Sequence, residues 1–224
     1  MIGFRILTRT RKVDAALVAA FREIPVANVS DAMFRMAAGG ARLRPMHNGC
    51  VLAGPALTVK TRPGDNIMVH KALDLAEPGD VVVVDAGGDL TNAIVGEIMS
   101  GYAHQRGLAG LVIDGAIRDA QAIRQGAFPV YAAGVTHRGP YKDGPGEINV
   151  PIAIDGMVIE PGDLIIGDAD GLLCVPYDAA QQVHAAALQR VTLEHRDRVA
   201  SANGTLERAW VDATLQRLGC AVKS

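Results

Sequence analysis

The stretch GLVIDGAIRD, residues 110–119, predicts a buried strand that ends at a charged turn. Its apolar run from Leu111 to Ile113 is typical of a strand inside a core. In open α/β folds, polar side chains at such strand ends line the crevice where ligands bind. Arg118 and Asp119, the adjacent cation and carboxylate at this turn, are therefore the first candidates for chemistry.

A second buried strand precedes this one in the sequence. Residues 81–85, VVVVD, form an uninterrupted apolar run, which is typical of a strand covered on both faces. Between the two strands we expect a helix over residues 92–105, with Thr91 as its cap and Gly107 at its end. Because a strand–helix–strand unit normally makes parallel neighbours, the sequence predicts an α/β fold.

The rest of the chain predicts further elements around this unit. The Asp155-Gly156 pair between two apolar runs is a strong hairpin signal. The tetrapeptide EPGD occurs at residues 77–80 and 160–163, and we interpret it as a reused turn because the surrounding segments do not match. We expect helices at residues 13–24 (ended by Pro25), from residue 30 or 31, and at 65–76, 120–125, 177–200 and 205–218. We expect strands at residues 51–55 and 56–60 (with a bend at 54–55), 128–132, 150–154, 157–159, 164–168 and 172–175.

The composition limits the classes of function. With 224 residues, of which 49% are hydrophobic, the chain can bury a large core, and we favour one domain over two. The formal net charge is -2 and no block of basic residues occurs, so the electrostatic pattern of a nucleic-acid-binding protein is missing. Small neutral or anionic metabolites are left as ligands.

The cysteines and the first residues bear on the compartment. Cys50, Cys174 and Cys220 are odd in number and far apart, which fits neither a disulfide framework nor a zinc site. Residues 1–12 lack the apolar region of a signal peptide, and no run of about 18 uncharged apolar residues predicts a membrane span. We therefore expect a cytoplasmic protein with no membrane partner.

The candidate site residues each allow a second interpretation. Asp119 could simply favour the dipole of the next helix, but Arg118 beside it could hold a ligand carboxylate while a cation on Asp119 holds the neighbouring carbonyl. Magnesium needs only one or two protein carboxylates. For Glu97, a solvated helix face is the alternative. The amides of residues 96–99 could bind an anion only at a helix N-terminus, which a helix that starts at residue 92 contradicts.

Other catalytic signatures are missing from the sequence. It contains no phosphate loop, no dinucleotide-binding glycine pattern and no Gly-x-Ser-x-Gly motif. The six histidines have no metal-ligand spacing, so we expect no zinc site. The polar loop at residues 137–147 could bind a ligand or be a plain surface turn, and residues 62–66 could be a connection with Asp65 as a helix cap.

Several short motifs in a fixed order resemble one known family. They are Gly54-Pro55-Ala56, Pro63-Gly64-Asp65-Asn66, Pro78-Gly79-Asp80-Val81, Gly96-Glu97, Arg106-Gly107-Leu108-Ala109-Gly110 and the run at residues 114–119. Over about residues 25–180 the chain resembles the RraA-like family, which includes class II 4-hydroxy-4-methyl-2-oxoglutarate and 4-carboxy-4-hydroxy-2-oxoadipate aldolases. The resemblance implies a swivelling β/β/α fold with mixed sheet layers. It also implies a single domain over residues 1–224, with C-terminal helices at about 177–218, that assembles as homotrimers or homohexamers with sites between subunits.

The resemblance also implies roles for individual residues. The aldolase signature is an acidic residue, twenty intervening residues and then Arg-Asp, and Glu97 stands at that distance before Arg118. The family's best-known version has Asp at the first position, so the longer Glu97 is a departure from it. The implied roles are a substrate pocket lined by Gly96, Glu97, Ile98 and Met99, pyruvate binding by Arg118, and coordination of Mg²⁺ or Mn²⁺ by Asp119.

The implied chemistry is cleavage of a 2-keto acid to pyruvate. A divalent cation chelated by the substrate's carboxylate and carbonyl acts as a Lewis acid, and Arg118 adds positive charge where the enolate oxygen develops. A water oriented by Glu97 removes the aldol hydroxyl proton. Oxaloacetate decarboxylation is expected through the same enolate. Glu194 matches, by position only, an acidic residue that these aldolases take from an adjacent subunit.

Two other functions occur under the same family name. Some members are regulators that inhibit ribonuclease E, and these lose the aspartate that follows the arginine. Asp119 is retained here, which favours an enzyme. A methyltransferase in menaquinone synthesis is a label given to some relatives, but no glycine-rich loop for adenosylmethionine is visible. The resemblance does not select among ring-cleavage acids, oxaloacetate and other 2-keto acids.

Overall fold

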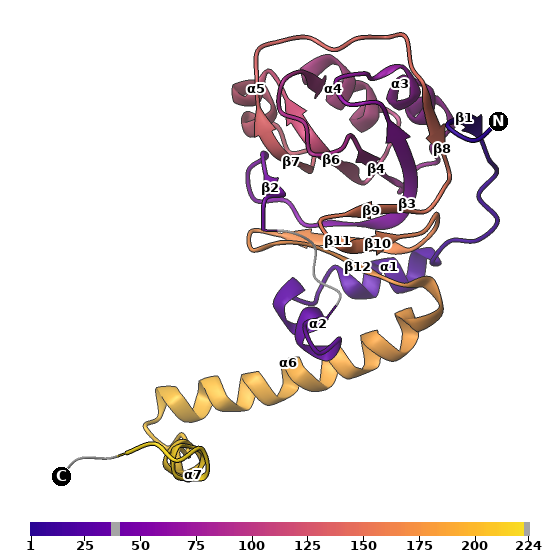
Figure 1. Cartoon of the computed structure of the whole chain (residues 1–224). Helices are drawn as coiled ribbons and strands as arrows, with labels where there is room; N and C mark the ends of the chain where they lie inside the picture. The colour runs from indigo at the N-terminus through magenta and orange to yellow at the C-terminus, as the bar shows by residue number, and fades with distance from the viewer. Residues whose placement is uncertain (37–40, 222–224) are drawn as a thin grey trace.

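The computed structural model describes residues 1–36 and 41–221 (Figure 1). Its strands are β1 (Phe4–Ile6), β2 (Arg44–Pro45), β3 (Leu52–Thr61), β4 (Val81–Asp85), β5 (Ala93–Val95), β6 (Gly110–Ile117), β7 (Val130–Val135), β8 (Gly146–Ile148), β9 (Ile152–Ile154), β10 (Met157–Ile159), β11 (Leu164–Asp168) and β12 (Gly171–Val175). Its helices are α1 (Ala15–Phe21), α2 (Val26–Ala32), α3 (Ile67–Leu75), α4 (Glu97–Gln105), α5 (Ala120–Gln125), the 3₁₀ turn η1 (Tyr177–Ala179), α6 (Ala180–Ala202) and α7 (Ala209–Arg217).

The main sheet has the order β1-β8-β3-β4-β6-β7-β2, and β3, β4, β6 and β7 run parallel to one another. The two runs that predicted buried strands lie next to each other at its centre, with Val82 opposite Leu111. Both side chains are fully buried, because the sheet is covered on its two faces. The expected parallel pair, and with it the α/β fold class, is confirmed.

The core is divided into layers. On one face of the parallel strands, α3 and α4 contribute residues such as Val69 and Ala103 to one apolar cluster. On the other face, the β9–β10 hairpin and the β11–β12 pair supply a second cluster, which includes Ile154 and Ile165. Beyond that, α1, α2 and α6 cover the outer side of β11 and β12 (Figure 1). The expected mixed sheet layers with C-terminal helices are confirmed.

Strand β3 belongs to both layers of sheet. Its first part, Leu52 to Pro55, pairs antiparallel with β11, and its second part, Ala56 to Lys60, pairs parallel with β4. The expected division into two strands at residues 54–55 is wrong, because pairing on both sides keeps the chain extended through this point. Gly54 lets the strand pass the turn before β4, since a Cβ there would lie 2.2 Å from the Gly79 carbonyl oxygen.

Two predicted helix starts are also wrong. Helix α4 begins at Glu97 and not at residue 92, because residues 93–95 form β5 beside the end of β6. Helix α2 begins at Val26, directly after Pro25, and not at residue 30 or 31. Asp168 Oδ2 of the neighbouring β11 accepts the Val26 amide at 2.9 Å. In both places a tertiary contact determines where the helix begins. A local sequence pattern holds no information about such a contact.

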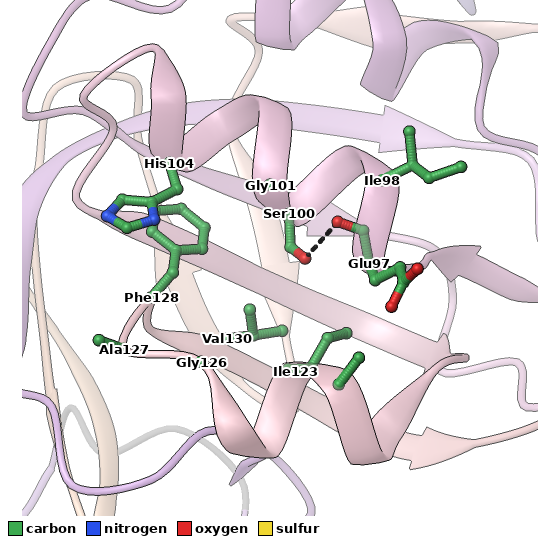
Figure 2. Close-up of a pocket in the computed structure, with 11 residues that line it drawn as sticks. Glu97, Ile98, Ser100, Gly101, His104, Ile123, Gly126, Ala127, Phe128 and Val130 are labelled. Carbon is green, nitrogen blue, oxygen red and sulfur yellow. Dashed lines mark hydrogen bonds between the residues drawn. The ribbon is translucent and has the colours of Figure 1, made fainter.

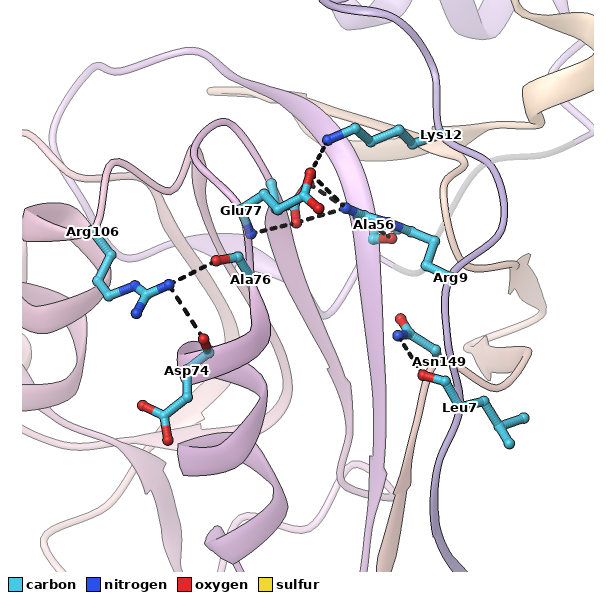
Figure 3. Close-up of polar contacts among 10 residues, drawn as sticks. Leu7, Arg9, Lys12, Ala56, Asp74, Ala76, Glu77, Arg106 and Asn149 are labelled. Atoms are coloured by element: carbon cyan, nitrogen blue, oxygen red, sulfur yellow. Dashed lines mark hydrogen bonds and ion pairs between the residues drawn. The ribbon is translucent and has the colours of Figure 1, made fainter.

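The two EPGD segments form the same turn. In each, the aspartate Oδ2 accepts a hydrogen bond from the backbone N–H of the glutamate at 2.9 Å, at Asp80 and at Asp163. The N-terminal segment passes both turns: Arg9 donates to the two carboxylate oxygens of Asp80 at 3.0 and 2.9 Å. Figure 3 shows Arg9 and Lys12 beside Glu77 of the same turn. Arg11 pairs instead with Glu160 at the second turn. The interpretation as a reused turn agrees with this geometry.

The C-terminal helices extend away from the layers (Figure 1). The first part of α6 packs on α1 and α2 and buries Ala180 and Ala187. The chain turns at Asn203-Gly204, as the sequence predicts, before α7. In residues 1–36 and 41–221, no helix combines the length and the apolar character needed to cross a bilayer.

Candidate active site

The charged turn after β6 is held against the start of α4. The Arg118 amide donates to the Val95 carbonyl at 2.9 Å, and Asp119 follows with a left-handed backbone, φ 55°. Aspartate is among the few residues that tolerate this region. Asp119 Oδ2 accepts a hydrogen bond from the Glu97 amide at 3.0 Å and lies 3.6 Å from Arg118 Nε. The carboxylate therefore lies at the positive end of α4.

Gly96 allows this close approach. A Cβ at residue 96 would lie 2.4 Å from Asp119 Oδ2 and 3.0 Å from Arg118 Cγ. The φ of -135° is open to any residue, so the requirement for glycine is one of space. Gly96 is also the N-cap of α4 and has no side chain to bond the first amides. Residues 96–99 thus form a helix N-terminus, and the objection to anion binding there is removed.

A cavity of about 180 Å³ opens beside this turn. It brings together five of the predicted site residues and five others. The predicted residues that line it are Gly96, Ile98, Met99, Arg118 and Asp119; the others are Asn66, His70, Ile94, Pro140 and Lys142.

Glu97 is not among the residues that line this cavity, and its side chain lines another one. That second cavity, of about 350 Å³, lies between α4 and α5 and is also lined by Ser100 and Ile123 (Figure 2). His104 stacks on Phe128 at its far end, with ring centroids 5.4 Å apart. The predicted roles of Glu97 therefore depend on a water or a side-chain movement, whereas those of Arg118 need neither.

The loop at residues 137–147 is bound firmly to the start of α3. The buried Asp65 accepts the amides of Asp143 and Gly144 on Oδ2, at 2.7 and 2.8 Å, and the Ile67 amide on Oδ1 at 3.0 Å. Burial alone would raise the pKa of Asp65, but these hydrogen bonds and Arg62 outweigh burial and hold the pKa below its usual value. The N-cap of α3 is Asn66 and not the expected Asp65, whose carboxylate instead joins the loop to the start of the helix.

Three polar residues of the cavity come from these two segments. Asn66 Nδ2 donates to the Ile94 carbonyl at 2.8 Å, and Lys142 Nζ donates to Asn66 Oδ1 at 3.5 Å. Burial, helped by the nearby Lys142, lowers the pKa of His70, and Asp74 opposes the shift. The sequence prediction missed all three roles. The only signal was the Pro-Gly-Asp-Asn motif, which by itself assigns Asn66 no function.

The donor set fits a hard cation that keeps part of its water shell. Asp119 presents a carboxylate that is 39% exposed and borders the cavity. In the part of the chain that the structure describes, no three His, Cys, Asp or Glu side chains converge as metal ligands, so a closed zinc-type cage is absent there. Magnesium uses one or two carboxylates together with water and substrate oxygens, which this site can satisfy.

Comparison with known proteins gives one consistent family. Residues 26–174 match the family model described as RraA-like, Aldolase/RraA. A protein of Halalkalibacterium halodurans, named "Putative 4-hydroxy-4-methyl-2-oxoglutarate aldolase", is 41% identical over 202 residues, which are 90% of this chain and 96% of that protein.

Two solved structures share the fold. A Pseudomonas syringae protein superposes with a TM-score of 0.77 at 26% identity, covering 86% of this chain and 95% of its own. A Streptomyces coelicolor protein, described as an unusual member of the RNase ES inhibitor RraA protein family, superposes with a TM-score of 0.76 at 28% identity, over 84% and 98% of the two chains.

Proposed function

The chain belongs to the RraA-like family, and from that premise we propose that it is a divalent-metal-dependent class II aldolase. Its proposed reaction is the cleavage of a 4-hydroxy-2-oxo acid of the 4-hydroxy-4-methyl-2-oxoglutarate type to pyruvate. One observation carries the proposal: Arg118 and the Asp119 carboxylate share a cavity wall at the N-terminus of α4. The name of the Halalkalibacterium relative supports the same reaction class.

The pyruvate end of the substrate would bind at the start of α4. The amides of Ile98 and Met99 belong to the unpaired first turn of the helix, where a carboxylate is favoured. Arg118, whose side chain is 43% exposed, can donate to the keto oxygen as negative charge develops there. Ile98 and Met99 also add apolar side chains to the cavity's lining, against which the carbon chain of the substrate can pack.

Asp119 is the proposed ligand of Mg²⁺ or Mn²⁺. When bound, such a cation supplies a Lewis acid for the keto acid. The hydrogen bond from the Glu97 amide fixes the Asp119 carboxylate, so that its orientation does not depend on the ligand. Glu97 would hold a water that receives the aldol hydroxyl proton and later returns a proton to carbon. Decarboxylation of oxaloacetate is proposed as a side activity, since it needs the same arginine and carboxylate.

The deciding experiment measures pyruvate release from oxaloacetate and from 4-hydroxy-4-methyl-2-oxoglutarate. Each substrate is assayed with magnesium, with a chelator, and with the Arg118→Lys variant. We expect turnover that requires the metal and falls sharply in the variant, because the flexible ammonium group of lysine does not reproduce the fixed position of the guanidinium donors. Folded protein without turnover of either substrate would contradict the proposed reaction.

A regulatory function is the second candidate. The Streptomyces protein is described as a member of a ribonuclease-inhibitor family, which favours a protein partner such as ribonuclease E. The two functions separate cleanly in one comparison. With magnesium present, a regulator lowers ribonuclease activity and releases no pyruvate, whereas the aldolase releases pyruvate and leaves the ribonuclease active.

We also propose a homotrimer or a homohexamer with sites between subunits. Exposed apolar side chains on the C-terminal helices, such as Leu193 and Trp210, support this assembly. Glu194 lies on α6, on the opposite side of the molecule from α4, so only another copy could bring it to the cavity (Figure 1). If Glu194→Gln keeps both metal affinity and rate, its proposed role at a neighbouring site is wrong.

A further inference from the structure

Lys142 places a second cation in the cavity that already contains Arg118. The polar contact that the structure gives its Nζ is the long one to Asn66 Oδ1, at 3.5 Å. Within the described ranges, no Asp or Glu oxygen forms an ion pair with Lys142. Its charge is therefore available to a ligand.

The backbone on both sides of Lys142 is held in place by hydrogen bonds, although the residue lies in a loop. On one side, the Tyr141 amide donates to the Gly64 carbonyl at 2.8 Å, and the Tyr141 carbonyl accepts the Asn66 amide at 3.0 Å. On the other side, the buried Asp65 accepts the amides of Asp143 and Gly144. These contacts hold the backbone of Lys142 in place beside the cavity.

The charges that line the cavity do not balance without a ligand. Arg118 and Lys142 are cationic, and Asp119 is the lining carboxylate that we assign to the metal. Burial and the nearby Lys142 lower the pKa of His70, which disfavours a third positive charge in this cavity. The cavity therefore favours a ligand with more than one negative group.

We propose that Lys142 binds the second carboxylate of a dicarboxylate 2-keto acid, and so determines which group lies beyond the bond that is cleaved. This inference rests on the proposed function, which assigns the first carboxylate to the start of α4. In this arrangement Lys142 determines substrate specificity, and Asp65 and Asn66 position it.

The test compares two 2-keto acids that an aldolase cannot cleave. Calorimetric titration with 2-oxoglutarate, a dicarboxylate, and with 2-oxobutanoate, a monocarboxylate, is carried out in the presence of magnesium. We expect wild-type protein to bind 2-oxoglutarate about tenfold more tightly, the gain of one charge-assisted hydrogen bond. Lys142→Met should abolish this preference, and Lys142→Arg should restore most of it.

A kinetic comparison complements the binding experiment. Exchange of the pyruvate methyl protons in D₂O requires Arg118 and Asp119 but no second carboxylate. In Lys142→Met we expect the KM for 4-hydroxy-4-methyl-2-oxoglutarate to rise about tenfold, with a change below about twofold in the KM for pyruvate exchange. Lys60→Met, at an exposed position of β3, is the matched control.

The outcomes separate this inference from the proposed function. Equal affinities of the wild-type protein for the two acids overturn the role of Lys142, whether or not the protein is an aldolase. An equal loss of both kinetic readouts in Lys142→Met overturns it as well, since that pattern indicates a structural role. A Lys142-dependent preference for 2-oxoglutarate without any pyruvate release supports the binding role and contradicts the aldolase alone.

Discussion

Asp119 combines an unusual backbone conformation with the proposed metal ligand. Replacement by alanine would confound the two, because alanine disfavours a positive φ. Asparagine tolerates that conformation and its amide oxygen can still accept the Glu97 amide, but it lacks the charge. We expect Asp119→Asn to fold normally and to lose at least about 100-fold in metal-dependent pyruvate release. An unchanged rate at saturating magnesium would exclude Asp119 as the ligand.

Gly96 tests the geometry rather than the charge of the site. A methyl group at this position would meet Asp119 Oδ2 at 2.4 Å and must displace it. We expect Gly96→Ala to lower kcat/KM about tenfold or more, since small displacements of catalytic groups are costly. Gly101→Ala on the same helix is the control, because a Cβ there meets no atom within 4 Å. It should raise the melting temperature, by better helix propensity worth about 1 kcal/mol, and leave the rate unchanged.

At the residue scale, the sequence predicted the part of the site that is local in the chain. Arg118 and Asp119 are adjacent, and Gly96 to Met99 are consecutive, so a motif can carry them. Asn66 and Lys142 are separated by 75 intervening residues, and tertiary hydrogen bonds made by Asp65 and by the Tyr141 backbone bring their segments together. Glu97 shows what a motif cannot predict. Its spacing from Arg118 does not determine which of the two cavities its side chain lines.

At the scale of elements, the turn before β4 depends on a buried ion pair. The Asp80 side chain is fully buried and Arg9 is 10% exposed, so removal of Arg9 leaves an uncompensated charge in the core (Figure 3). We expect Arg9→Met to reduce the free energy of unfolding by about 3 kcal/mol or more, measured by urea denaturation. Arg11→Met removes exposed pairs from the same segment and should change the urea midpoint far less. Equal effects would show that burial does not distinguish the two arginines.

The loop that carries Lys142 should be sensitive to acid. The folded-state pKa of Asp65 is lowered, so the carboxylate contributes stability that is complete above its unfolded pKa, about 4, and is lost as pH falls through the folded value. We expect Asp65→Asn to be less stable than wild type at pH 7 and to show a smaller loss between pH 5 and pH 3. Melting temperatures of both proteins, measured by calorimetry across this pH range, test the role of Asp65. If the melting temperatures of variant and wild type fall in parallel, that role is contradicted.

The elements that the sequence predicted well are those whose pattern is complete in itself. The apolar run of β4 and the Asp-Gly hairpin between β9 and β10 are two examples. The errors occur where contacts with a distant segment determine the type or the first residue of an element. Residues 93–95 become a strand only because the end of β6 is free to pair, and α2 starts at Val26 because Asp168 caps it.

At the scale of the whole molecule, the C-terminal helices present apolar side chains that this chain does not cover. Trp210 on α7 is 65% exposed. We expect light scattering to give the mass of a trimer or hexamer, and Trp210→Glu to lower that mass. Val158→Glu, which changes a 63% exposed residue of β10, should not. A wild-type monomer at micromolar concentration would contradict the proposed assembly.

The unbroken strand β3 has a consequence for how a ligand enters. One unbroken strand pairs with β11 through its first part and with β4 through its second, so the two sheet layers cannot separate without breaking the hydrogen bonds of one part or the other. A clamshell motion of the layers would therefore have to bend this buried strand. We expect substrate and product to exchange through smaller movements of exposed side chains at the cavity's rim, such as Arg118 and Lys142. The rate at which that rim moves then sets an upper limit on turnover.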